Sequence, residues 1–150
     1  MKLAYSLAAG FALVAAPAAA QSWSDEQTEV WKFVSDAWAS HAENDTWYEV
    51  LDDDGFGWGN QWPVPTSKAE MQRRSRVFGD EGKILYYRLD PVRITVSGDT
   101  AIAYYYAGIT ELDHKDEREN NREMCADTLV KRGGAWRFLG WNCFSKSDGD

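Results

Sequence analysis

The stretch that decides the fold runs from Arg122 to Phe144 and reads R-E-M-C-A-D-T-L-V-K-R-G-G-A-W-R-F-L-G-W-N-C-F. It is typical of two strands joined by a tight turn at Gly133 and Gly134, because adjacent glycines readily adopt the positive φ angles of hairpin turns. We expect a turn centred on Gly134. Alternate residues of a strand point to opposite faces, so the length of this turn decides which side chains share a face.

The register set by this turn brings chemically different side chains together. With the turn centred on Gly134, one face is predicted to carry the pairs Cys125–Cys143, Asp127–Trp141 and Leu129–Leu139, and the other face Thr128–Gly140 and Val130–Phe138. The only two cysteines of the chain would then face each other. A carboxylate would lie beside an indole on an otherwise apolar wall. A two-residue turn would shift the pairing by one and send the two cysteines to opposite faces.

The first 20 residues have the features of a secretory signal peptide. Lys2 precedes the apolar run Leu3–Val14, and the small residues Ala18–Ala20 form a cleavage site. A retained membrane anchor is the alternative, but the run is short for a bilayer. We therefore expect residues 1–20 to be removed and residues 21–150 to form one domain that is periplasmic or secreted.

The predicted export affects the expected state of the cysteines, and the charge of the exported chain affects its expected partners. Cys125 and Cys143 would reach an oxidising compartment, where disulfides persist, so a bridge is favoured over two buried free thiols. Two cysteines and two histidines do not make a zinc site, and no metal is expected. Removal of Lys2 changes the net charge from −8 to −9. An acidic chain repels phosphate backbones, so nucleic acid is a poor partner. No membrane partner is expected after signal cleavage.

Three helices are predicted from capping boxes, in which Ser or Thr is followed three residues later by Glu or Gln. They begin at Ser24, Thr46 and Ser67 and are expected to end near residues 42, 51 and 78. On the first helix, an apolar face at helical spacing ends at His41.

The remaining segments are typical of strands and loops. A short strand is expected at residues 56–58. Two long strands, 84–96 and 100–112, precede the hairpin already described, and Pro91 predicts a bulge or an edge in the first of them. The charged segment 113–121 is interpreted as a solvent-exposed loop. The predicted fold is α+β, with four long antiparallel strands whose buried face packs against the helices.

Three stretches carry a family resemblance. They are the Gly-rich loop around Trp58 followed by P-V-P-T-S-K-A-E, then V-R-I-T-V-S-G-D-T-A-I-A-Y-Y-Y, and then D-T-L-V-K-R-G-G-A-W-R-F-L-G-W. Together they resemble the SnoaL-like branch of the nuclear transport factor 2-like superfamily, over almost all of residues 21–150. The resemblance implies a cone-shaped curved antiparallel sheet wrapped around N-terminal helices, with a pocket at the open end. Members include ketosteroid isomerases, polyketide cyclases, dehydratases and epoxide hydrolases. Others are non-catalytic ligand-binding or assembly domains, and homodimers through the sheet are common.

Asp127 is the strongest candidate for catalysis. A carboxylate on a half-buried strand beside Trp141 would be desolvated, which raises its pKa and suits a general base that removes a proton next to a carbonyl. Tyr105 is the candidate partner, because an inward hydroxyl could polarise that carbonyl. The alternatives are a solvent-facing Asp127 or one in a structural salt bridge, and a tyrosine that only hydrogen-bonds within the core. No complete catalytic set of the superfamily matches this sequence residue by residue.

The predicted function is the binding of a small, largely apolar molecule in an aromatic pocket. The candidate ligand-binding residues are Trp58, Trp62, Arg122, Trp141 and His41. Catalysis, if present, would be cofactor-free acid–base chemistry such as isomerisation, cyclisation or dehydration. A non-catalytic binding module is the alternative. A third possibility is a homodimeric interaction domain in which Trp58 and Trp62 fill the cone as core.

Overall fold

A computed structural model gives the fold of residues 22–44, 46–59, 63–78, 83–113 and 115–145. The predicted signal peptide and Trp62 lie outside these residues. The helices are α1 (Asp25–Asn44), the 3-10 helix η1 (Trp47–Val50) and α2 (Lys68–Phe78). The strands are β1 (Leu51–Trp58), β2 (Thr66–Ser67), β3 (Lys83–Ser97), β4 (Thr100–Leu112), β5 (Arg118–Arg132) and β6 (Ala135–Ser145).

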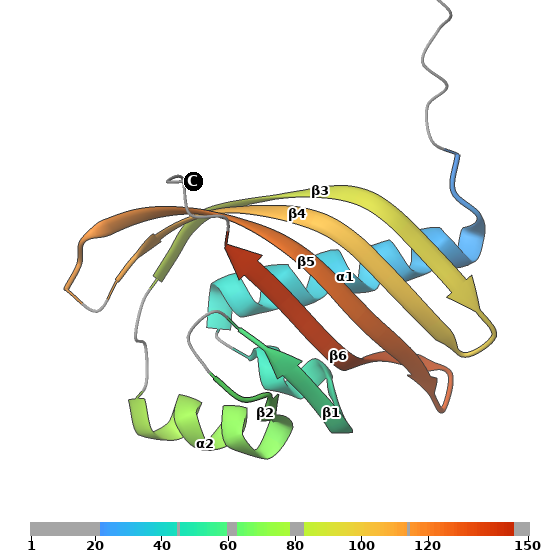
Figure 1. The fold of residues 1–150 in the computed structure, drawn as a ribbon, viewed down its shortest axis with the longest axis horizontal. Helices are drawn as coiled ribbons and strands as arrows, with labels where there is room; N and C mark the ends of the chain where they lie inside the picture. The colour runs from blue at the N-terminus through green and yellow to red at the C-terminus, as the bar shows by residue number, and fades with distance from the viewer. Residues whose placement is uncertain (1–21, 45, 60–62, 79–82, 114, 146–150) are drawn as a thin grey trace, which may run out of the picture.

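The six strands form one curved sheet in the order β2-β1-β6-β5-β4-β3 (Figure 1). The long strands bend over α1, which lies along the inner face of the sheet, while α2 lies beside β1 and β2 (Figure 1). The predicted α+β cone is confirmed. The long strands pair antiparallel as expected, but β1 is longer than the predicted 56–58 strand and pairs parallel to β6. Among the described residues, no helix is both long and apolar enough to cross a membrane.

Two of the three predicted capping boxes form. The Ser24 backbone N–H donates to Gln27 Oε1 at 2.9 Å, and the Gln27 N–H donates to Ser24 Oγ at 3.2 Å. Ser67 and Glu70 make the same reciprocal pair before α2. The predicted box at Thr46 does not form, because its hydroxyl is paired with the hydroxyl of Ser40 at 2.7 Å. The segment after it is a single 3-10 turn.

The register of the β5–β6 hairpin was predicted correctly at its far end and wrongly near its turn. Arg132 pairs with Ala135, so the turn has two residues, Gly133 and Gly134, with φ values of 59° and 86°. The predicted pairs Leu129–Leu139 and Val130–Phe138 are therefore wrong, and the pairs observed are Leu129–Phe138 and Val130–Arg137.

A β-bulge then restores the predicted register. The shift lies between Thr128 and Leu129 on β5, and Leu139 is the extra residue on β6. Beyond it Thr128 pairs with Gly140 and Cys125 with Cys143, as predicted. Because the bulge offsets the shorter turn, the two cysteines face each other after all.

Two other expectations concern the edge of the sheet and the charged segment. Pro91 lies at a register shift in β3, which is an edge strand, so the proline removes no hydrogen bond from the interior of the sheet. The prediction of a loop over residues 113–121 is wrong in its second half, because β5 begins at Arg118. Polar side chains there alternate between the two faces of a strand that projects beyond the core (Figure 1).

The core lies between α1 and the inner face of the sheet. Val30, Val34, Ala37 and Trp38 are the buried residues of α1, as the predicted helical spacing requires. They meet alternate inward residues of the strands, among them Tyr105, Leu129 and Phe138. The helix is thus fixed against the sheet along most of its length, and it holds Trp38 at the inner face of the sheet.

Candidate functional site

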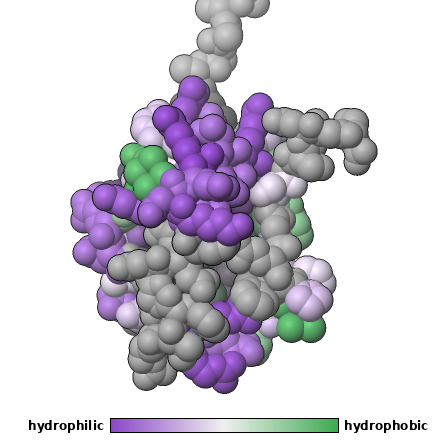
Figure 2. Space-filling view, turned by 90° about the vertical axis from the view of Figure 1, so that its left-hand side faces the viewer, coloured by the Kyte–Doolittle hydropathy of each residue, from purple (hydrophilic) through white to green (hydrophobic). Residues whose placement is uncertain are grey.

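A cavity of about 470 Å³ opens between the sheet, η1 and the C-terminal part of α1. This volume is in the range of small-molecule sites. One side of the cavity is aromatic, lined by Trp38, His41, Trp47, Trp58 and Trp141. Figure 2 views the molecule from the side toward which the β4–β5 hairpin projects, and hydrophilic side chains gather over the upper part of that surface.

The aromatic wall depends on the parallel pairing of β1 with β6. Gly57 is the partner of Trp141, and Trp58 is the partner of Asn142. A Cβ added at Gly57 would overlap the indole of Trp141, so only glycine lets this ring lie flat across β1. Trp141 is buried beside Gly57, whereas Trp58 remains 43% exposed.

Another part of the cavity lining is polar and acidic. Glu111 of β4 and Glu119, Asn121 and Glu123 of β5 line it. None of these four was a candidate in the sequence. Counting back from Asp127 in steps of two would have found the three β5 residues. The interpretation of residues 113–121 as a loop excluded Glu119 and Asn121, whereas Glu123 lies within the predicted strand and was overlooked.

A disulfide joins β5 to β6 at the edge of the cavity. Cys125 and Cys143 are bonded, as favoured by the sequence, and Cys143 lines the cavity. Glu123 has a carboxylate oxygen within 4.8 Å of both sulfurs, the one close group of potential metal donors among the described residues. Because the sulfurs are bonded to each other, they offer no thiolate, so this group does not make a transition-metal site.

Asp127 lies inside the protein rather than on the cavity surface. Its side chain is fully buried, and it is absent from the lining. The Tyr105 hydroxyl donates to Asp127 Oδ2 at 2.7 Å, and Trp38 Nε1 donates to the Tyr105 oxygen at 2.9 Å. Asp127 Oδ1 has no hydrogen-bond partner among the described residues. This chain of hydrogen bonds links the sheet to α1, and its outer end, Trp38, reaches the cavity.

Burial controls the ionisation of this pair. Removal from water raises the pKa of Asp127 to about 7, against the opposing effects of the Tyr105 hydrogen bond and, more weakly, of the Asn142 backbone N–H. Burial, together with the neighbouring Asp127 carboxylate, also raises the pKa of Tyr105 well above its usual value, so the phenol stays protonated and donates. An unmet carboxylate oxygen with a pKa near neutrality is suited to exchanging protons.

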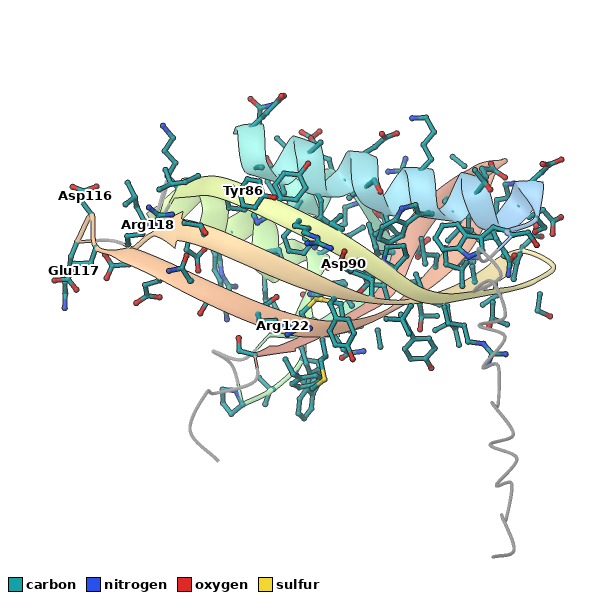
Figure 3. All side chains as sticks on the ribbon, turned by 90° about the horizontal axis from the view of Figure 1, so that it is seen from above. Tyr86, Asp90, Asp116, Glu117, Arg118 and Arg122 are labelled. Carbon is teal, nitrogen blue, oxygen red and sulfur yellow. A yellow bond between two sulfur atoms is a disulfide. The ribbon has the colours of Figure 1, made fainter. Side chains whose placement is uncertain are left out.

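The structure brings together some of the residues predicted as a site and separates others. Trp58, Trp141 and His41 line the cavity. Arg122 lies on the outer face of the sheet, where its guanidinium stands over the ring of Tyr106 at 5.2 Å, away from α1 (Figure 3).

We predict that Asp127→Asn changes how stability depends on pH. The folded-state pKa of about 7 exceeds the unfolded value of 3.8, so the native state binds the extra proton between these values. The contribution of Asp127 is therefore fully present below pH 3.8 and is lost as pH rises from there through 7. In urea unfolding, the wild-type free energy should fall relative to the variant by on the order of 3 kcal/mol between about pH 5 and pH 8. Parallel curves for the two proteins would contradict a raised pKa.

The chain is similar to a known protein family and to several solved structures. The profile of the SnoaL-like domain matches residues 32–142. A ketosteroid isomerase-like protein from Erwinia carotovora atroseptica is 16% identical, with a TM-score of 0.70 over 83% of this chain and 99% of that chain. Aln2 from a Streptomyces species is 17% identical, with a TM-score of 0.66 over 83% and 94%. The S. rosetta CaMKII hub is 15% identical, with a TM-score of 0.66 over 83% and 100%.

Identities this low show a shared fold and leave the activity open. No curated protein matches the chain significantly. The family profile, in contrast, spans most of the chain, from within α1 to Asn142 of β6, and includes the bulge at Leu139. The chain therefore belongs to the SnoaL-like family of the nuclear transport factor 2-like superfamily.

Proposed function

We propose that this protein is an exported binding protein for a small molecule with a flat apolar part. The observation that carries the proposal is the cavity of about 470 Å³ with indole rings on one side. Trp58 and Trp141 come from neighbouring strands and offer ring surface at low cost in conformational entropy. The Cys125–Cys143 disulfide supports export, because such bonds persist in oxidising compartments.

Binding is favoured over catalysis because the candidate base does not line the cavity. Asp127 is fully buried, and one of its oxygens is already bonded to Tyr105. The residues that do touch the cavity are aromatic rings, carboxylates and small polar groups.

A second candidate function is cofactor-free acid–base catalysis. The raised pKa of Asp127 and its unmet Oδ1 favour it. The base would take a proton from the carbon next to a carbonyl and return it to another carbon, while a hydrogen-bond donor stabilises the intermediate enolate oxygen. The substrate would need to reach Oδ1 past the residues that line the cavity.

A second copy of the chain is the proposed protein partner. Tyr106, Met124 and Phe144 pair across β4, β5 and β6 and form an exposed row on the outer face of the sheet, each at least 37% exposed. Arg122 lies over Tyr106, and Arg88 pairs with Asp90 at one end of the row. An apolar row with charged flanks suits burial against its own copy.

Blocking the cavity should reduce ligand binding. The neutral dye N-phenyl-1-naphthylamine serves as the probe. Gly59 lines the cavity, and a Cβ there would meet nothing within 4 Å, so Gly59→Leu should fold normally and place a side chain in the binding space. We expect at least about a fivefold loss of affinity in fluorescence titration, equivalent to roughly 1 kcal/mol.

Gly108→Leu is the matched control. Gly108 has the same open space around its Cβ, but it pairs with Arg88 and Arg122 and lies outside the cavity lining. Unchanged affinity in Gly59→Leu, or an equal loss in both variants, would contradict the cavity as the binding site.

The catalytic candidate predicts turnover that depends on Asp127. The probe is the isomerisation of cyclohex-3-enone to its conjugated isomer, followed by ultraviolet absorbance. Asp127→Asn should lower the rate by about 10²- to 10⁴-fold, the usual contribution of a general base. Equal rates for wild type and variant, or no rate above buffer for either, would rule this candidate out.

Expression of the whole chain in a bacterium tests export and self-association together. We expect the protein in the periplasmic fraction, with an intact mass that begins at Gln21, and a dimer by light scattering. Met124→Lys should give the monomer, because it places a charge in the apolar row. Cytoplasmic protein that retains residues 1–20 would overturn export, and a wild-type monomer at high micromolar concentration would overturn the dimer.

A further inference from the structure

We infer that the ligand of the cavity carries a positive charge, as an organic amine or quaternary ammonium group attached to an apolar body. This inference rests on the proposed binding function and deepens it. Two independent features of the cavity support it. Indole rings line one part of it, and another part is lined by carboxylates that pair with no cation among the described residues.

The carboxylates are gathered at one end of the inner face. Glu111 and Glu119 are direct cross-strand partners on β4 and β5, and Glu123 lies on the same face of β5. All three line the cavity. Like charges directly opposite each other on neighbouring strands destabilise a sheet. An arrangement that is unfavourable for folding becomes favourable when a cation lies between the carboxylates.

Neighbouring groups satisfy these carboxylates only in part. Asn121 Nδ2 donates to Glu111 Oε1 at 2.7 Å, and Ser145 Oγ lies 3.4 Å from Glu123 Oε1. The ion pairs between described residues involve none of Glu111, Glu119 and Glu123. Burial and the nearby Glu111 raise the pKa of Glu123, so its negative charge is held at a cost that a bound cation would relieve.

The aromatic residues of the cavity also favour a positively charged ligand. The faces of indole rings carry negative electrostatic potential and attract cations, above all alkylammonium groups. Trp38 and Trp47 lie edge to face at 6.0 Å, and Trp58 and Trp141 add ring surface from β1 and β6. Among the described lining residues there is no Lys or Arg to receive an anion.

An organic cation fits better than a metal ion. Among the described residues, Glu111, Glu119 and Glu123 do not bring their oxygens together as a close donor group. A bare divalent ion needs several oxygens at about 2.0–2.6 Å, whereas an alkylammonium group makes longer contacts with both carboxylates and rings. A cavity lined by both carboxylates and aromatic rings therefore suits a molecule with an apolar body and a positively charged end.

Three probes of similar size and different charge test the inference: 2-phenylethylamine, 2-phenylethanol and 3-phenylpropionate. Affinities are measured by NMR titration at about pH 7.5 and constant ionic strength. We expect the amine to bind about tenfold more tightly than the alcohol, and the acid more weakly than both. Glu123→Gln and Glu111→Gln should each reduce the preference for the amine several-fold, while binding of the alcohol stays unchanged.

Glu26→Gln is the matched control. It alters the net charge equally, but Glu26 lies in the first turn of α1, outside the cavity lining. The preference for the amine should survive this change.

The outcomes separate the two proposals. Equal binding of amine and alcohol, or a preference that is insensitive to Glu123→Gln, overturns the charged ligand and leaves the binding cavity standing. Failure of all three probes to bind, together with failure of the naphthylamine dye, overturns both. Calcium that binds in the micromolar range and depends on Glu123 would show that the carboxylates serve a metal ion, and would also overturn the inference.

Discussion

The inner wall of the cone depends on one extra residue in β6. The Gly133–Gly134 turn has two residues, so the strands leave it in a register that would turn Cys143 outward. The bulge at Leu139 moves the remaining part of β6 by one position, and from there Trp141 and Cys143 point inward. Trp141, the disulfide and the β6 partners of Gly57 and Trp58 all lie beyond this bulge, whereas Phe138, the partner of Leu51, lies before it. A sheet without it would present a different set of side chains to the interior.

The interior of the cone contains one fully buried carboxylate, which is held by hydrogen bonds. Asp127 is removed from water, yet its Oδ2 is fixed by Tyr105, whose oxygen in turn accepts from Trp38. These bonds tie β5, β4 and α1 together and define one position for the helix on the sheet. The remaining oxygen, Oδ1, is unmet among the described residues. A buried carboxylate oxygen without a hydrogen-bond partner lowers the stability of the folded state. Native proteins that contain such a group often use it in their function.

Local patterns in the sequence predicted most of the fold. They failed where contacts between distant residues determine the local structure. Two capping boxes form as expected, whereas that of Thr46 is lost because Ser40 competes for its hydroxyl. The cysteine pairing was predicted through two errors that cancel, the turn length and the missed bulge. Glu119 and Asn121 of the cavity were missed because a strongly charged segment is usually a loop, while here β5 extends through it. Nothing local signals that β1 pairs parallel to β6.

That parallel pairing has a consequence for the order in which the chain can assemble. Leu51, near the start of the described chain, is the partner of Phe138, near its end. Contacts of such high sequence separation form late, since closing a long loop loses entropy before any contact rewards it. The antiparallel β3–β6 meander can form from neighbours alone, but Gly57 and Trp58 reach Trp141 only when β1 docks on the last strand. A nascent chain on the ribosome therefore has no completed aromatic cavity until β6 has emerged.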